Sequence, residues 1–217
     1  FGEEDREMLQ AVANLAAIAL ENAKLLSDLK KSLLDTVKTL SRALCAKEEY
    51  TLTHSEMVSL YSQKIARELG VGEEALQEIH LSSLLHDLGK IGVKDSVLQK
   101  PGRLDEKERE ELEKHVLFGP AILDDSSLSE GVKAAIRHHQ ERYDGLGYPD
   151  GLAGEKIPLA SRIIAVADAY HAMISDRVYR PALPKEVAVA ELKKGAGGQF
   201  DPRIVQVFLT IIEREGL

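Results

Sequence analysis

The sequence predicts an all-α protein in which one long N-terminal helix precedes a bundle of shorter helices. Apolar residues recur three or four positions apart through most of the chain, and glycine and proline gather in short breaks between these stretches. No stretch alternates apolar and polar residues long enough to form a sheet. The apolar run 163–167 has strand propensity, but its flanks favour a buried helix and no partner strand is evident.

The long helix is predicted from the first 45 residues. No glycine or proline interrupts the chain between Glu3 and Leu69, and acidic residues at the start suit a helix N-terminus. A seam spaced three or four residues apart consists of Leu26, Leu29, Leu33, Val37, Leu40 and Leu44. This spacing is typical of a coiled coil and predicts pairing with a second copy or an upstream domain. The alternative is a helix that folds back on the rest of the chain.

The remaining helices are expected between turn signals. Gly70, Pro101, Pro158 and Pro184 mark breaks, and the stretch 144–154 is rich in glycine and aspartate. The expected helices cover residues 55–69, 73–86, 105–123, 130–139, 160–174, 185–194 and 202–215.

Composition narrows the function classes. The 217 residues carry 28 basic and 36 acidic side chains, a net charge of -8, which argues against non-specific binding to nucleic acid or to an anionic membrane surface. No run approaches the roughly 20 apolar residues that span a bilayer, and the start lacks the features of a signal peptide. We therefore expect a cytoplasmic protein, in which an anionic substrate meets a local cluster of positive charge.

A candidate metal site begins with adjacent His86 and Asp87, which follow Leu84-Leu85 at the end of a predicted helix. A carboxylate pressed against a core is costly unless it binds a cation or a metal. Taken alone, the pair favours a buried His–Asp hydrogen bond over a metal site, because two-residue motifs occur by chance. Further metal-binding residue types stand at other helix ends or in apolar sequence, and each has an ordinary structural explanation by itself: His54, His115, His138, His139 and Asp168.

Together these residues resemble the HD-GYP branch of the HD metal-dependent phosphohydrolases, over roughly residues 48–208. The resemblance rests on ordered blocks: HDLGK at 86–90, LQKPGRL at 98–104, ERYDGLGYP at 141–149, RIIAVAD at 162–168, SDRVYR at 175–180 and GQFDP at 198–202. Residues 1–25 resemble the last helix of a GAF sensor domain. The resemblance implies an HD-domain helical bundle over residues 32–217, preceded over residues 1–31 by a sensor end and a signalling helix.

The resemblance also implies the roles of individual residues. It assigns two divalent metal ions, iron or manganese with zinc as the alternative, and Asp87 as their bridge. Lys90 is implied to act with Asp87 in catalysis and to face a substrate phosphate, while Arg177, Arg180 and Tyr148 face the substrate. The implied metal ligands are His54, His86, Asp87, His115, His139 and Asp168.

Three positions depart from the family pattern. Gln140 stands where a second histidine is usual, so His138, two positions earlier, is a further candidate ligand. Tyr50 replaces a glutamate of members with three metals, which predicts two ions rather than three. His171 stands where a second aspartate often follows Asp168.

The resemblance implies a phosphodiesterase that opens cyclic di-GMP to linear pGpG, with slower cleavage to GMP as a second step. The upstream sensor and a homodimer formed through the N-terminal helix are the implied partners. Two alternatives stay open: a module that binds a cyclic dinucleotide or a partner protein with little turnover, and a hydrolase of another cyclic dinucleotide. A di-iron oxygenase is disfavoured because Lys90, Arg177 and Arg180 indicate a phosphate substrate.

Overall fold

The all-α prediction is confirmed by the computed structural model, which describes residues 2–45, 54–176 and 181–217. Within these ranges the only β-type pairing is an isolated bridge between Ala196 and Phe200. The α-helices are α1 (Glu3–Cys45), α2 (His54–Glu68), α3 (Glu73–Leu85), α4 (Asp95–Leu98), α5 (Glu106–Glu113), α6 (His115–Ile122), α7 (Glu130–His138), α8 (Leu159–Ile174), α9 (Lys185–Gly195) and α10 (Pro202–Glu215). Two short 3-10 helices are η1 (Leu88–Gly92) and η2 (Gly154–Lys156).

The chain divides into two compact units, Phe1–Thr39 and Leu40–Leu217. The described part of the first unit lies within or just before α1, which carries acidic residues in its first turn. Its apolar side chains are largely exposed, with Leu26 60% and Leu29 66% accessible. None of the helices described here combines the length and the apolar character that a membrane crossing requires.

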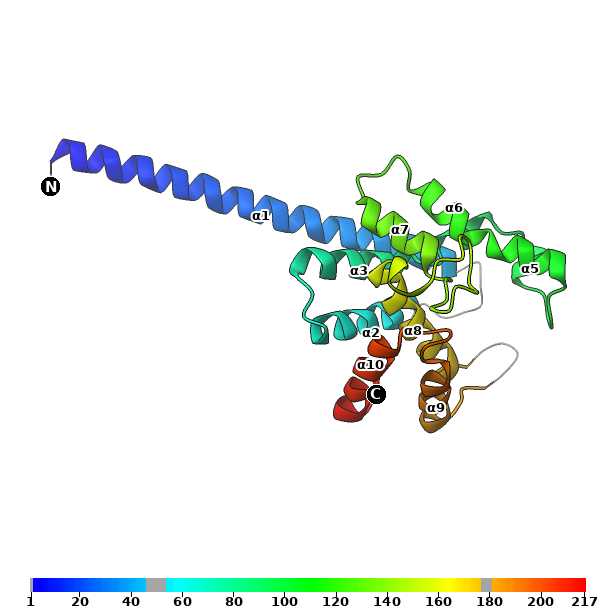
Figure 1. Cartoon of the computed structure of the whole chain (residues 1–217). Coiled ribbons are helices and arrows are strands. Elements are labelled where there is room, and N and C mark those ends of the chain that lie inside the picture. Colours follow the sequence, from blue (N-terminus) through cyan, green and yellow to red (C-terminus); the bar gives the residue numbers. More distant parts are fainter. Residues whose placement is uncertain (1, 46–53, 177–180) are drawn as a thin grey trace. The chain divides into compact units, whose positions relative to one another are not determined.

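The second unit is a bundle built around α2, α3 and α8. Helix α2 packs against α3 and α8, while α9 and α10 pack against α8. Helices α6 and α7 lie toward one end of this bundle and α9 and α10 toward the other (Figure 1). Ring contacts between Tyr61, Tyr170 and Phe208 join α2, α8 and α10 in the core. The run 163–167, considered as a strand, lies inside α8 and is mostly buried.

The prediction of one continuous helix over residues 105–123 is wrong, because the chain breaks at Lys114 into α5 and α6. A capping box between Asp105 and Glu108 starts α5, which buries none of its residues, whereas α6 is apolar. Helical periodicity continues through both halves, so the sequence pattern does not reveal the break. The break separates the exposed helix α5 from helix α6, which packs on the predicted metal-binding region.

Two glycines let α6 approach its neighbours. A side chain at Gly89 in η1 would place its Cβ 1.8 Å from the carbonyl oxygen of His115. A Cβ at Gly119 in α6 would lie 2.8 Å from Ile136 of α7. Neither distance is compatible with a real Cβ, so glycine is required at both positions. The close packing brings the start of α6 and the end of α7 to the end of α3.

Candidate metal centre

The structure brings together the six metal ligands that the resemblance implied, from five different helical elements. His86 and Asp87 follow α3, His115 begins α6, and His139 follows α7. His54 begins α2, and Asp168 lies within α8. The four histidines among them are at most 5% exposed. Such burial of polar groups from distant parts of the sequence indicates a built site.

The backbone fixes the orientation of three of these imidazoles in the same way. Nδ1 of His86 donates to the carbonyl oxygen of Ser83 at 2.8 Å. Nδ1 of His115 and Nδ1 of His139 donate to the carbonyls three residues earlier, at 2.7 Å in each case. Because a carbonyl can only accept, Nδ1 carries the proton in each ring. In the neutral ring Nε2 then keeps its lone pair, the arrangement expected of a metal-binding histidine.

These Nε2 atoms converge on the carboxylate of Asp87. His115 and His139 lie 3.8 and 4.0 Å from Oδ1, and His86 lies 3.5 Å from Oδ2. The Nε2 atoms of His115 and His139 are 3.3 Å apart. Among the described residues, the buried Nε2 of His86 has no hydrogen-bond partner. Opposed lone pairs and an unpartnered buried acceptor are costly without a cation between them, so this donor set fits divalent metal ions.

A second arrangement holds His54. Its Nε2 lies 3.2 Å from Oδ1 of Asp168, and its Nδ1 lies 2.8 Å from Nδ1 of His171. His171 in turn contacts the hydroxyl of Ser175 through Nε2 at 3.1 Å. His171, noted in the sequence only as a departure from the family, therefore supports His54. Its position three residues after Asp168, on the same helix face, is the signal that identifies it.

Asp87 belongs to two potential metal-binding groups. One consists of His54, His86 and Asp87, and the other of Asp87, His115 and His139. In each group the ligand atoms lie within 4.8 Å of one another. One carboxylate contributing to both groups is what a bridging ligand requires.

The electrostatics of the site suit metal binding. Burial, followed by the positive charge of neighbouring histidines, lowers the pKa of His139 to about 3, and burial also lowers the pKa of His115. Both rings are thus neutral at pH 7, as metal ligands must be. Burial alone would raise the pKa of Asp87, but Lys90 and the surrounding histidines outweigh it and hold this pKa well below its usual range. Burial alone would also raise the pKa of Asp168, but the hydrogen bond from His54 outweighs it and lowers this pKa.

Of the residues expected to face the substrate, two are described. Nζ of Lys90 lies 2.9 Å from Oδ2 of Asp87, so its charge is held at the centre. The ring of Tyr148 lies 6.5 Å from that of His115, edge to face. Arg177 and Arg180 lie outside the described residues, as does Tyr50.

His138, the further candidate ligand, is not brought to Asp87. Its Nδ1 lies 3.6 Å from Oε1 of Glu141 and 3.7 Å from Oδ2 of Asp150, in a separate cluster. The chain leaves α7 after His138, so adjacent histidines face different groups. Asp150 is also held by Arg137 through contacts of 2.8 and 3.0 Å, which already supply the positive charge that a metal would bring.

Glu141 is the structural residue that sequence reasoning missed. Its buried carboxylate accepts from the backbone N–H groups of Asp150 and Leu152, at 2.8 and 3.1 Å. The loop is further closed by Gly147, whose Cβ, if present, would lie 2.3 Å from the backbone nitrogen of Arg142. Together these contacts hold the segment that carries Tyr148. A glutamate next to a glycine-rich loop was the available signal.

Comparison with known proteins gives the family. Residues 38–204 match the HD domain family, so the chain belongs to it, and the HD-GYP resemblance is confirmed. The chain is 40% identical over 198 residues to the cyclic di-GMP phosphodiesterase response regulator RpfG of Xanthomonas campestris, covering 89% of this chain and 52% of that protein. It is 35% identical over 211 residues to the 3'3'-cGAMP-specific phosphodiesterase 2 of Vibrio cholerae, covering 96% of this chain and 40% of that protein.

A solved structure confirms the HD-domain fold. The cyclic GMP-AMP specific phosphodiesterase V-cGAP3 of V. cholerae superposes with a TM-score of 0.67 at 22% identity, covering 82% of this chain and 48% of that one. The chain thus spans about half the length of the relatives that it matches, or less.

Proposed function

We propose that this chain is a metal-dependent phosphodiesterase that hydrolyses cyclic di-GMP to linear pGpG, with slower cleavage to GMP as a second step. The observation that carries the proposal is the position of Asp87 in two metal-binding groups, with Lys90 beside it. The phosphodiesterase names of both relatives support the reaction class.

The metal content follows from the same groups. His115, His139 and Asp87 would hold one ion, and His54, His86 and Asp87 the other, with Asp168 beside His54. When bound, such ions supply a water of lowered pKa as nucleophile and neutralise charge on the scissile phosphate. Imidazole and carboxylate donors suit iron or manganese, with zinc as the alternative. The proposed count is two because Tyr50 offers a phenol, whose unperturbed pKa of about 10 makes it a poor ligand at neutral pH.

The protein's own contribution is positioning and charge. Imidazoles held at Nδ1 by backbone carbonyls would present Nε2 to a metal ion without reorganisation. Lys90 would offset the negative charge that develops on the phosphate oxygens during attack, and Arg177 and Arg180 would add guanidinium contacts from the segment after α8. Tyr148, held by the Glu141-clamped loop, would border the substrate.

The test is a single experiment on the purified chain loaded with Fe²⁺ or Mn²⁺. Metal content is measured, and products from cyclic di-GMP are separated by chromatography. We expect two ions per chain and formation of pGpG that stops when the metals are chelated. Binding of cyclic di-GMP without any product would instead show the alternative, a binding module in which Gln140 has reduced turnover.

A second candidate substrate is 3'3'-cGAMP. The chain is 35% identical to a V. cholerae protein named for this activity, over 96% of this chain. The two substrates share a guanosine half and differ in the other base. The same chromatography with both compounds at equal concentration decides between them by the ratio of kcat/KM.

We also propose that residues 1–31 connect an upstream GAF-like sensor to the HD-GYP domain at 32–217, in a cytoplasmic protein that forms a parallel homodimer through the N-terminal helix. The supporting observation is the exposure of Leu26 and Leu29 on α1. Sedimentation should show a wild-type dimer, and a monomer when both are changed to Asp. Ser27→Asp, at an exposed polar position, is the control. A wild type that is monomeric at about tens of micromolar would contradict the dimer.

A further inference from the structure

A cavity lies beside the metal centre and shares Tyr148 with it. Its volume is about 530 Å³, and it is lined by Arg103, Leu104, Arg109, Leu112, Glu113 and Tyr148. It lies between the loop before α5, the exposed helix α5 and the loop that carries Tyr148. This volume falls within the range of roughly 300–1,000 Å³ that small-molecule sites occupy.

The cavity adjoins the proposed reaction centre through two of its residues. Tyr148 contacts the ring of His115 edge to face at 6.5 Å, so the same tyrosine borders both the cavity and the centre. Glu113 is the last residue of α5, two positions before His115. A part of the substrate that extends beyond a phosphate at Asp87, on the side of Tyr148, would therefore reach this cavity.

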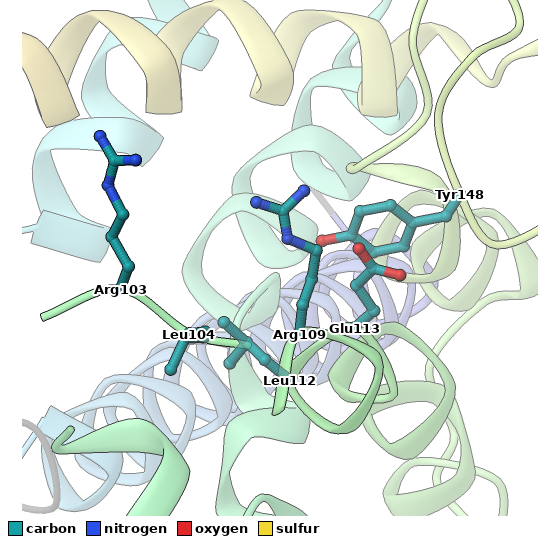
Figure 2. Close-up of a pocket in the computed structure, with 6 residues that line it drawn as sticks. All are labelled: Arg103, Leu104, Arg109, Leu112, Glu113 and Tyr148. Carbon is teal, nitrogen blue, oxygen red and sulfur yellow. The ribbon is translucent and has the colours of Figure 1, made fainter. Parts of the chain in front are cut away.

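The lining combines groups of opposite charge with an apolar and aromatic surface. Figure 2 shows the Glu113 carboxylate and the Arg109 guanidinium directed toward the Tyr148 side chain, with Arg103 apart from them. Burial, and then the nearby charge of Glu113, raise the pKa of the Tyr148 hydroxyl, which keeps it a protonated donor. Among the described residues, neither Arg103 nor Arg109 has a carboxylate within 4.0 Å as an ion-pair partner. Leu104 and Leu112 supply the apolar surface.

We infer that this cavity is a purine subsite that selects guanine, an inference that rests on the proposed function and names its specificity determinant. Guanine presents donors at N1 and N2 that a carboxylate such as Glu113 can accept. It also presents acceptors at O6 and N7, which arginine binds in a two-bonded contact. The base has a face that stacks on tyrosine or on a guanidinium plane.

Other occupants fit the lining less well. A second phosphate of the substrate would be attracted by Arg103 and Arg109 but repelled by Glu113. Adenine has a lone pair at N1 where guanine has a proton, so it could offer the Glu113 carboxylate only its N6 amino group, whereas guanine offers two adjacent donors at N1 and N2. A carboxylate in a nucleotide pocket is therefore the feature that distinguishes guanine from the alternatives.

The test uses Glu113→Gln in the metal-loaded full chain, with Glu110→Gln on the exposed face of α5 as the charge-matched control. Selectivity is measured as the ratio of KM for cyclic di-GMP to the inhibition constant of cyclic di-AMP. We expect Glu113→Gln to weaken selection for the guanine compound about 10- to 100-fold, because one charge-assisted contact is lost.

A second variant tests the contact with O6 and N7, the acceptors of guanine. Arg109→Gln should raise KM for cyclic di-GMP about tenfold, whereas Lys107→Gln, on the same helix, should not. Circular dichroism and metal content establish that each variant is folded and loaded.

If the wild type turns over cyclic di-GMP and Glu113→Gln leaves the selectivity unchanged, the guanine subsite is wrong. The proposed function then still stands. A wild type that binds cyclic di-GMP without turnover defeats the phosphodiesterase proposal, and the dissociation constants then replace KM in testing the subsite. A chain that neither binds nor hydrolyses cyclic dinucleotides overturns both.

Discussion

The two halves of the metal centre are held in place by different parts of the protein. In the half formed by Asp87, His115 and His139, both imidazoles are anchored to a backbone carbonyl three residues earlier. In the other half, His86 is anchored in the same way, whereas His54 is anchored by a side chain, the imidazole of His171. Backbone anchors are present whatever side chain occupies the anchoring position. A side-chain anchor disappears with one substitution.

This difference indicates in which half of the centre a single substitution can change the metal affinity. Support by outer groups typically changes metal affinity by about 10–100-fold. For three of the histidines that support comes from the helix ends themselves, so it is fixed by the fold. For His54 it depends on His171, the position at which this chain departs from the family. We expect the His54 half to be the adjustable one.

The largest effect is predicted for the residue that belongs to both halves. Asp87→Ala should remove metal from both groups and bring hydrolysis below detection, because the shared carboxylate is lost from each. The helical fold should survive, since the rings remain anchored to the backbone. Metal analysis and circular dichroism measure both outcomes.

Asp125→Ala, an exposed aspartate after α6, is the control and should keep full metal content. Retention of two ions per chain by Asp87→Ala would show that Asp87 is not the bridge.

Much of this architecture could be predicted from the sequence. Helical periodicity and the glycine and proline breaks located the longer helices, with ends mostly within one or two residues, but not the short elements α4, η1 and η2. The sequence does not reveal the break at Lys114 because both halves are helical, and the close approach of the His115 backbone to Gly89 joins segments far apart in the sequence. The motif blocks indicated which histidines gather at Asp87. They did not reveal that His138 turns to Glu141, because one step along the chain at a helix end changes the direction of a side chain.

The difference between the two halves of the metal centre is tested most directly at His171. His171→Ala should weaken one of the two metal-binding steps about 10–100-fold and leave the other unchanged, because only His54 loses its anchor. Calorimetric titration of the metal-free chain with Mn²⁺ resolves the two steps. His171→Asn, which retains a hydrogen-bonding atom close to the position of Nδ1, should recover part of the affinity. Equal weakening of both steps would show that the halves do not differ as described.

A smaller effect is expected at Lys90, which contacts the shared carboxylate without belonging to either donor group. Lys90→Ala should leave metal content nearly unchanged and reduce turnover about 10- to 100-fold, because one charge-assisted phosphate contact contributes about 1.5–3 kcal/mol. Steady-state kinetics on cyclic di-GMP measure the loss, and Lys94→Ala, four positions along, is the control. Unaltered kinetics would remove Lys90 from the reaction, and loss of metal would make it part of the centre's support.

The smallest effect is predicted where the backbone is the anchor. The carbonyl oxygen of Ser83 accepts from Nδ1 of His86, while the Ser83 hydroxyl donates to the carbonyl oxygen of His80 at 2.9 Å. Ser83→Ala removes only the second bond, so it should cost about 0.5–1.5 kcal/mol of unfolding free energy. Because the carbonyl remains, both Mn²⁺ affinities should stay within about twofold of wild type, in contrast to the expected effect of removing the side-chain anchor. Thermal unfolding and the same calorimetric titration measure the two quantities. A tenfold loss of metal affinity in this variant would mean that the serine side chain, rather than the helix backbone, orients His86.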